Sequence, residues 1–280
     1  MSCLVRIDNY RDSFTDSEKK IADYIVQNAE SVVKLTIHEL ASETDVSPST
    51  ITRFVRRLNY KSFSEMRVEL ARSIDNSIVS DFNKVIQWSK TMDELSQCFI
   101  STITSVCEDV LNLNDLSKFE QATDWIKDSD IVYLFGVGAS SLIVEDLQQK
   151  LMKLNKRCIF NIDSNFGVQN AVLTRENDVV FAVSYSGRTK EVNIAVRRAK
   201  KNGAKIVSIT RYGRTPLSEL SDLCIYVPNV EQSARLAAIF SRYAQMFIVD
   251  ILFVNYAKRI ENKPEQLLSE YRSLLGTLKE

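Results

Sequence analysis

Residues 179–191 read VVFAVSYSGRTKE, an apolar run that breaks abruptly into hydroxyls and one glycine before helix-forming sequence resumes. β-Branched and aromatic residues without polar alternation are typical of a strand covered on both faces, as in a parallel sheet. After such a strand, the next helix presents unpaired N–H groups and the positive end of its dipole, which attract anions. Ser184, Ser186 and Thr189 add hydroxyl donors there. The stretch therefore predicts a strand, a turn and a helix that together suit a phosphate group.

A second turn of this kind lies upstream, where residues 136–141 (GVGASS) follow the apolar run 131–135 (IVYLF). The first stretch resembles the phosphate loop of sugar isomerase (SIS) domains, whose pattern Ser-x-Ser-Gly-x-Thr it matches at all four fixed positions, and the upstream turn stands where that family carries its first ligand loop. The resemblance implies a phosphosugar site formed by Gly138, Ser140, Ser184, Ser186, Gly187 and Thr189. The alternative is that the serines merely cap a helix.

The rest of the C-terminal half alternates between strand and helix patterns. We predict strands at 131–135, 157–162, 178–184, 205–210 and 223–227, and helices between them at 140–155, 165–174 and 189–202. This order predicts an α/β doubly wound domain with a five-stranded parallel sheet. A long segment, 233–261, is expected to cover the sheet, and 264–279 to form a terminal helix. All seven glycines lie at or after residue 136, so we expect the first half to be helical.

The N-terminal part carries clear helix-start signals. Capping boxes occur at 15–18 and 36–39, and Ser47 is a natural N-cap before Pro48, a residue favoured at the first helical position. The helix that follows places Ile51, Phe54 and Val55, with Leu58, on one face. Its outer face carries hydroxyls and arginines, a pattern typical of the recognition helix in a helix-turn-helix. The predicted DNA contacts are Ser47, Ser49, Thr50, Thr52, Arg53, Arg56, Arg57 and Lys61.

The distribution of charge indicates a local nucleic-acid-binding site, whereas the net charge gives no general attraction to nucleic acid. Lys and Arg number 36 and Asp and Glu number 36, so the whole molecule does not attract nucleic acid. Residues 53–72 nevertheless hold six Lys or Arg against two acids. The alternative, a basic helix face that is simply solvated, is common, but the turn and cap spacing favour a DNA-binding helix.

The run from Val46 to Phe63 is similar to the N-terminal domain of the RpiR family of bacterial transcription regulators, which pair it with a C-terminal SIS domain. The resemblance covers nearly the whole chain, and one departure is Asn59, where the family usually has Gly; Asn is the next best residue for a left-handed helix C-cap. It implies a regulator of sugar metabolism that binds operator DNA and a phosphorylated sugar effector, as a homodimer or homotetramer. We expect a helix-turn-helix domain at 1–76, a helical connector at 77–114 and an SIS-like domain at 115–280.

Several classes of protein are disfavoured. The five cysteines show no C-x-x-C pairing, which is typical of reduced thiols in a cytoplasmic protein. No basic-then-apolar leader is visible, and the apolar stretch 246–254 is short and interrupted by Asp250, so we expect neither secretion nor membrane spanning. His38 is the only histidine, which excludes a histidine-rich metal site. We expect no metal and no cofactor.

Two other functions stay open from the residues alone. A sugar-phosphate isomerase would use Glu145, Glu191 or Glu231 as a base, although no histidine is available in that half for ring opening and the attached DNA-reading module favours sensing. A dinucleotide-binding domain would use 136–138 with Asp163 on the ribose, but Ser141 replaces the third glycine of that fingerprint.

Overall fold

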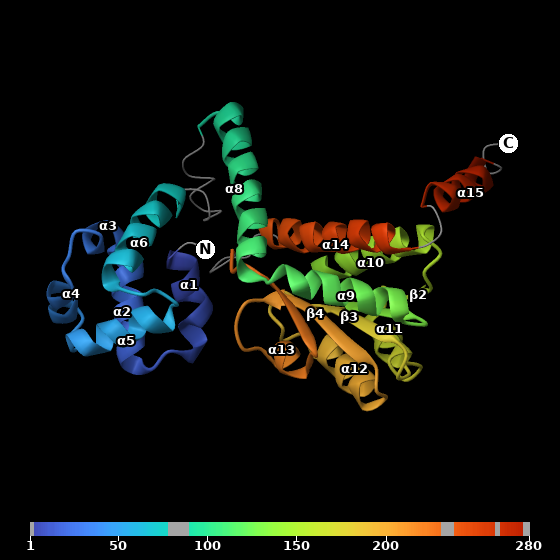
Figure 1. The fold of residues 1–280 in the computed structure, drawn as a ribbon, viewed down its shortest axis with the longest axis horizontal. Coiled ribbons are helices and arrows are strands. Elements are labelled where there is room, and N and C mark those ends of the chain that lie inside the picture. Colours follow the sequence, from blue (N-terminus) through green and yellow to red (C-terminus); the bar gives the residue numbers. More distant parts are fainter. Residues whose placement is uncertain (1–2, 78–89, 231–237, 261–263, 277–280) are drawn as a thin grey trace. The chain divides into compact units, whose positions relative to one another are not determined.

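A computed structural model describes residues 3–77, 90–230, 238–260 and 264–276 (Figure 1). The chain divides into two compact units, one made mainly of Met1–Ser105 and one made mainly of Val106–Val227 and the helices that follow. The division falls inside α8 (Met92–Leu113), and therefore inside the predicted connector 77–114. Part of that connector, 78–89, lies outside the described residues.

The N-terminal unit is helical up to residue 77, as predicted from the absence of glycine. Ile7, Ile21, Leu40, Phe54 and Met66 are fully buried in its core. The capping boxes predicted at Thr15 and Thr36 are both present. In chain order the helices are α1 (Cys3–Tyr10), the 3-10 helix η1 (Arg11–Ser13), α2 (Asp16–Gln27), α3 (Ala29–Val32), α4 (Ile37–Glu43), α5 (Pro48–Arg57) and α6 (Phe63–Ser77).

Both α4 and α5 end in the same left-handed turn. At the end of α5, Tyr60 N–H donates to the Val55 carbonyl at 3.2 Å and Asn59 N–H to the Arg56 carbonyl at 2.9 Å. This bond pair is a Schellman motif, and it requires the positive φ of +63° at Asn59. The sequence-based prediction that Asn59 supports the left-handed turn in which the family usually has Gly is confirmed. Asp45, at φ +52°, ends α4 in the same way and directs the chain into α5.

The C-terminal unit holds a five-stranded, all-parallel sheet in the order β2-β1-β3-β4-β5, which confirms the predicted fold class. Its strands are β1 (Val132–Gly136), β2 (Cys158–Ile159), β3 (Val179–Val183), β4 (Lys205–Arg211) and β5 (Leu223–Val227). All five residues of β1 and of β3 are buried, as expected for strands covered on both faces.

Helices cover both faces of this sheet (Figure 1). The helices α9 (Leu116–Asp128), α10 (Ala139–Lys153) and α14 (Phe240–Arg259) pack together, and α11 (Ser164–Asn170), α12 (Lys190–Lys201) and α13 (Pro216–Leu220) form a second group. The terminal helix is α15 (Pro264–Gly276). The predicted sheet-covering segment 233–261 corresponds to α14, and its first part, to residue 237, lies outside the described residues. Helix α13 is an addition to the predicted order.

Candidate functional site

The chain reverses its direction across the sheet between β1 and β3. From β1 it moves outward to β2 and then returns to β3 on the other side of β1. Gly136, the last residue of β1, pairs with Val183, the last residue of β3, so the two loops that follow begin side by side. Such a switch point at the carboxyl ends of parallel strands is where open α/β sheets bind ligands. The two glycine-serine loops predicted from sequence are therefore brought together here.

The loop after β3, residues 184–189, forms hydrogen bonds with β4, α12 and α13. Ser184 N–H donates to the Ile209 carbonyl at 3.1 Å. The Gly187 carbonyl accepts from Leu217 N–H at 3.1 Å and from the Asn193 side-chain Nδ2 at 3.2 Å. These bonds fix the path of the loop on α12 and α13.

Gly187 cannot be replaced without disturbing this loop. Its φ is +65°, and a Cβ there would overlap the Thr215 hydroxyl and lie 2.9 Å from the Thr210 Oγ1. The Thr215 hydroxyl in turn caps α13 by accepting from Ser218 N–H at 3.1 Å. The glycine of the predicted pattern is thus explained by two independent constraints, a left-handed backbone and a close approach.

The hydroxyls of the loop surround the start of α12 without capping it. Ser184 Oγ and Thr189 Oγ1 share a hydrogen bond at 2.8 Å, and Ser186 Oγ accepts from Arg188 N–H at 3.2 Å. Thr189 is the N-cap residue of α12, but its side chain makes no capping hydrogen bond. The N–H groups of the first turn of α12 are therefore not used by these hydroxyls, which leaves them available to an anion.

The loop after β1 has the same character. Gly138 is the N-cap residue of α10 at φ +62°, and a Cβ there would meet no atom within 4 Å, so the backbone borders open space. Ser140 is buried, and the Ser141 hydroxyl donates to the Gly138 carbonyl at 2.7 Å. The sequence placed Gly136 in this turn but not among the site residues, and in the structure a Cβ there would lie only 2.7 Å from the Ser140 carbonyl oxygen. A glycine directly at a strand end was the available signal.

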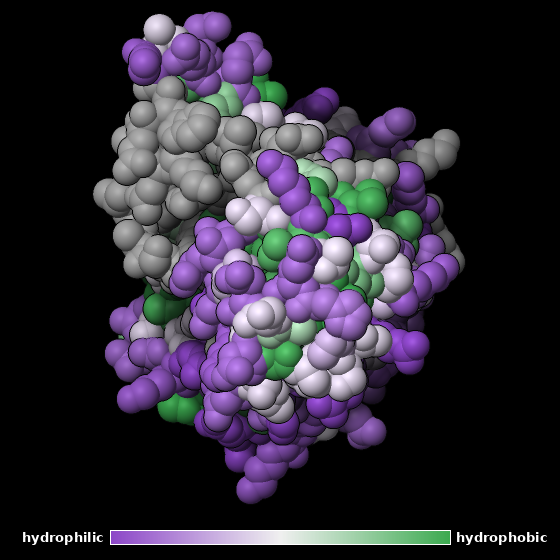
Figure 2. All heavy atoms as spheres, turned by 90° about the vertical axis from the view of Figure 1, so that its left-hand side faces the viewer, coloured by the Kyte–Doolittle hydropathy of each residue, from purple (hydrophilic) through white to green (hydrophobic). Residues whose placement is uncertain are grey.

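The predicted recognition helix is α5, and its outer face is exposed as predicted. Ser47, the N-cap, accepts from Thr50 N–H at 3.2 Å, and its hydroxyl also bonds those of Ser49 and Thr50. Thr52 donates to the Pro48 carbonyl at 3.0 Å. The exposed members of the predicted set are Ser47, Ser49, Thr52, Arg53, Arg56 and Lys61, whereas Thr50 is half-buried. Figure 2 views the molecule from the side of the N-terminal unit and shows hydrophilic residues around small hydrophobic patches.

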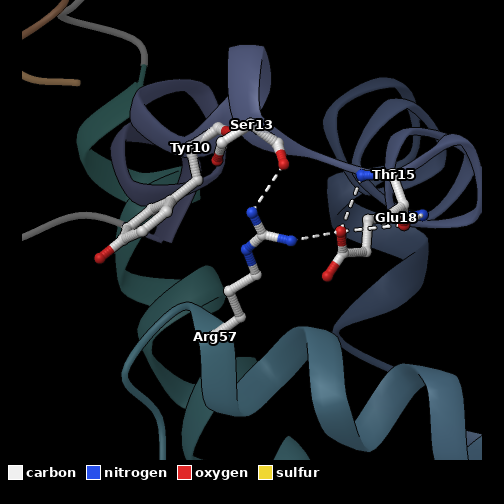
Figure 3. A network of polar contacts seen from close by, with 5 residues as sticks. All are labelled: Tyr10, Ser13, Thr15, Glu18 and Arg57. Atoms are coloured by element: carbon white, nitrogen blue, oxygen red, sulfur yellow. Dashed lines mark hydrogen bonds and ion pairs between the residues drawn. The ribbon is translucent and has the colours of Figure 1, made fainter. Parts of the chain in front are cut away.

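Among the predicted DNA contacts, Arg57 points toward Ser13 and Glu18 (Figure 3). Its Nη1 donates to Glu18 Oε2 at 2.6 Å, its Nη2 donates to the Ser13 carbonyl at 2.6 Å, and its guanidinium stands 5.6 Å from the centre of the Phe14 ring. The helical-wheel prediction placed this side chain on the outer face. The structure shows it pairing α5 with the start of α2 instead, because a buried carboxylate stands within its reach.

Glu18 serves two elements at once. It closes the capping box of α2 by accepting from Thr15 N–H at 2.8 Å, and it accepts from Arg57. Burial favours a raised pKa for the Glu18 carboxyl, but the hydrogen bonds from Thr15 and Arg57 outweigh it and hold the pKa below its ordinary value. Arg67 is likewise committed, since it donates to the Leu35 carbonyl at 2.8 Å. Two of the six basic residues in 53–72, Arg57 and Arg67, therefore stabilise the N-terminal unit.

Metal and membrane features are absent from the part of the chain that the structure describes. No cluster of three or more His, Cys, Asp or Glu suited to a metal ion occurs among these residues. None of the helices within the described ranges is long and apolar enough to cross a bilayer.

Comparison with known proteins agrees with both halves of this geometry. The helix-turn-helix domain model of the rpiR family matches residues 1–77, and the SIS domain model matches residues 126–255. An uncharacterized HTH-type transcriptional regulator of Caldanaerobacter subterraneus subsp. tengcongensis is 33% identical over 95% of this chain and 94% of its own length. The chain belongs to the rpiR family of transcriptional regulators.

Other relatives of this rpiR-family regulator extend over most of its length. An HTH-type transcriptional regulator of Haemophilus influenzae is 30% identical over 89% of the chain and 88% of its own length. Among solved structures, the NanR protein of Vibrio vulnificus, complexed with ManNAc-6P, is 27% identical with a TM-score of 0.62 and covers 99% of each chain. The sugar isomerase domain of an RpiR transcription factor from Sphaerobacter thermophilus shares the fold, with a TM-score of 0.55 at 18% identity, over 62% of this chain and 96% of its own.

Proposed function

We propose that this regulator binds operator DNA through α5 and a phosphorylated sugar through the two loops at the carboxyl ends of β1 and β3. The observation that carries the proposal is the uncapped start of α12, surrounded by the hydroxyls of Ser184, Ser186 and Thr189, in a chain that also holds a helix-turn-helix. The NanR neighbour, solved with ManNAc-6P, supports a sugar phosphate as the ligand class.

In this site the phosphate lies against the first turn of α12. The Ser186 hydroxyl and one hydroxyl of the Ser184–Thr189 pair donate to its oxygens together with the free N–H groups of the helix, while the other hydroxyl of the pair donates to its partner. Ser140 donates from the opposite loop. Gly138 and Gly187 allow the backbone to approach, because neither has a side chain and both have positive φ.

On the DNA side, we propose that Arg53 and Arg56 contact the operator together with Ser49 and Thr52, and that Lys61 contacts a phosphate. These side chains are exposed on or beside α5. Ser47 and Thr50 shape the helix start through their mutual hydrogen bonds. Arg57 acts through Glu18, by fixing the position of α5.

The quaternary state, location and lack of catalysis belong to the same proposal. One helix-turn-helix reads one half-site, so operator binding calls for a homodimer or homotetramer. The five cysteines are free thiols, which suits a cytoplasmic regulator. We assign the SIS domain to sensing and not to isomerisation because the same chain carries a helix-turn-helix domain. Of the candidate bases, Glu145 lies half-buried on α10, Glu191 is exposed at the start of α12, and Glu231 lies outside the described residues.

A thermal-shift panel tests the ligand class. ManNAc-6P and other hexose 6-phosphates should raise the melting temperature of the wild-type protein, because a ligand at a hundred times its Kd adds about 2.7 kcal/mol of stability. The unphosphorylated sugars should have no effect. Prolonged incubation of the stabilising sugar phosphate with the protein should leave it chemically unchanged, whereas turnover would make the protein an isomerase.

A further inference from the structure

One buried polar side chain lies behind the 184–189 loop and is not among the predicted site residues. Asn193 stands on α12, four residues after Thr189, and its side chain is almost fully buried. The other buried side chains of this helix are all apolar and are Val192, Ala195, Val196 and Ala199. Buried polar groups in folded proteins are normally hydrogen-bonded. The reason for an asparagine on this apolar face is therefore sought in its hydrogen bonds.

The side-chain amide of Asn193 is only half used. Its Nδ2 donates to the Gly187 carbonyl at 3.2 Å, whereas its Oδ1 is buried and accepts no hydrogen bond from any described residue. The reverse orientation of the amide would place two acceptors against each other, so Nδ2 is the atom that faces the carbonyl. A buried acceptor without a partner destabilises the fold, and an apolar side chain of similar shape would avoid that penalty. The contact with Gly187 therefore explains the asparagine, and stability does not.

The Gly187 carbonyl decides which way one peptide group of the loop faces. It accepts from Leu217 N–H at 3.1 Å and from Asn193. The peptide bond that follows is trans, so the Arg188 N–H points in the opposite direction, where it donates to Ser186 Oγ at 3.2 Å. A hydroxyl that accepts one hydrogen bond still has its own hydrogen to donate. This orientation therefore turns the carbonyl away from the loop hydroxyls and leaves Ser186 as a donor to an anion.

Glycine makes the opposite orientation of this peptide accessible. Gly187 has no side chain of its own to hinder rotation of the peptide group that follows it. The rotated peptide would present the Gly187 carbonyl oxygen, and no longer the Arg188 N–H, to Ser186 and to a bound phosphate. Carbonyl and phosphate oxygens are both acceptors and cannot bond each other. The hydrogen bonds from Leu217 and Asn193 therefore select the orientation that suits a phosphate.

We infer that Asn193 is a positioning residue of the phosphate loop: without touching the ligand, it holds the peptide between Gly187 and Arg188 in the orientation that binds phosphate. The inference rests on the proposed phosphosugar site. It also explains why a residue that destabilises the core of α12 is present, since binding sites often hold residues that a more stable fold would replace.

The test measures affinity and stability in matched variants. ManNAc-6P and glucose 6-phosphate are titrated calorimetrically into the wild type, Asn193→Leu, Asn193→Ala and Asn202→Leu, and the affinity for inorganic phosphate is measured by displacement. Chemical denaturation gives the stability of each protein. Asn202 is the control, because it lies at the other end of α12 and its Nδ2 donates to the Ala171 carbonyl at 3.2 Å and to Thr174 Oγ1 at 3.1 Å.

The two asparagines should respond in opposite ways. Asn193→Leu should be at least as stable as the wild type, because it removes the unpartnered acceptor. It should nevertheless bind sugar phosphate and inorganic phosphate about two- to fivefold more weakly, the change expected when one of two orienting hydrogen bonds is lost. Asn193→Ala lacks the same donor and should weaken binding equally, so the result does not depend on how well Leu packs. Asn202→Leu should lose stability and keep the affinities of the wild type.

The outcomes separate the inference from the function on which it rests. Unchanged affinities in both Asn193 variants overturn the inference, and so does a loss of stability in Asn193→Leu that accompanies the loss of affinity. Weaker binding of the sugar phosphate alone overturns it too, because a rotated loop peptide must affect every phosphate. A wild type that binds neither sugar phosphate contradicts the proposed function, and with it the inference, whatever the stabilities of the variants.

Discussion

Arg53 and Arg57 lie one helical turn apart on α5, but only Arg53 is exposed, while Arg57 is held by Glu18 and Ser13. Replacing Arg53 with Ala should weaken operator binding by about 1–3 kcal/mol if the guanidinium contacts a base edge. Lys61→Ala should weaken binding to all DNA sequences alike and lower the salt slope by about one. Gel shifts on operator and unrelated DNA at several salt concentrations check both. Unchanged operator affinity in Arg53→Ala would contradict the assignment of α5 as the recognition helix.

Arg57→Ala should act through stability. The pair with Glu18 is partly buried, so its loss should cost about 1–2 kcal/mol, between the values for exposed and fully buried pairs. Any loss of DNA affinity should leave the salt slope unchanged, because no phosphate contact disappears. The control is Arg56→Ala, which removes the exposed neighbouring arginine and should lower the slope while barely changing stability. A lowered slope in Arg57→Ala would show that Arg57 reaches the DNA.

The same pair gives a pH dependence with a definite sign. The pKa of Glu18 is lowered in the folded state, so its contribution to stability is complete above the unfolded carboxyl pKa, about 4.3, and is lost as the pH falls through the folded value. The free energies of unfolding of the wild type and Glu18→Gln, measured by denaturant melts, should therefore converge once the pH falls below the folded-state pKa of Glu18. A stability difference that persists undiminished into acid would contradict the ionic origin of this contact.

At the scale of elements, the glycines of the two ligand loops, Gly138 and Gly187, differ in a testable way. Gly138→Ala should cost about 1–3 kcal/mol for its backbone alone, because φ +62° with ψ −129° is strained for any residue with a side chain and the new Cβ meets open space. Gly187→Ala should cost more, because the new Cβ must also displace Thr215 and with it the cap of α13. Chemical denaturation of both variants checks the order. Equal costs would mean that Thr215 moves aside freely.

Most elements could be predicted from sequence because local signals and burial agreed. The strands β1 and β3 are continuous apolar runs, and the caps of α2, α4 and α5 lie where their hydroxyl and acidic residues indicated. Predictions were weaker where the signal is short. Helix α13 has five residues, and β2, at the edge of the sheet, has two where six were predicted.

The candidate site shows the same limit. The ligand loops were found because strand ends and glycines mark them. The inward turn of Arg57 was missed because its partner, Glu18, lies 39 residues away and no local pattern connects them. Gly136 was placed in the first loop without a reason for its being glycine, because the atom that excludes its Cβ, the Ser140 carbonyl oxygen, becomes a neighbour only once α10 has formed.

At the scale of the whole molecule, the two activities lie in separate units of one chain. A fragment of residues 1–77 should fold, because Ile7, Phe54 and Met66 are buried in a core of its own. It should bind the operator much more weakly than the full chain, since a single helix-turn-helix reads one half-site and the remaining chain is proposed to supply the dimer. Sedimentation and gel shifts check this, and a monomeric fragment with full-length affinity would contradict it.

The central claim is that a sugar phosphate on the 184–189 loop and operator DNA on α5 influence each other. Coupling between two ligands is reciprocal, so the affinity of the wild type for the sugar phosphate should change by the same factor on adding operator as the operator affinity changes on adding sugar phosphate. Ser186→Asp should bind operator in the absence of sugar phosphate as the wild type does but should not bind the sugar phosphate, because it places a like charge where the phosphate is proposed to lie. The decisive measurement is a calorimetric titration of the sugar phosphate into both proteins, with and without operator. The account predicts a shifted affinity in the wild type and no binding in the variant. Unchanged sugar-phosphate binding by folded Ser186→Asp protein, or a wild-type affinity that does not respond to operator, would contradict it.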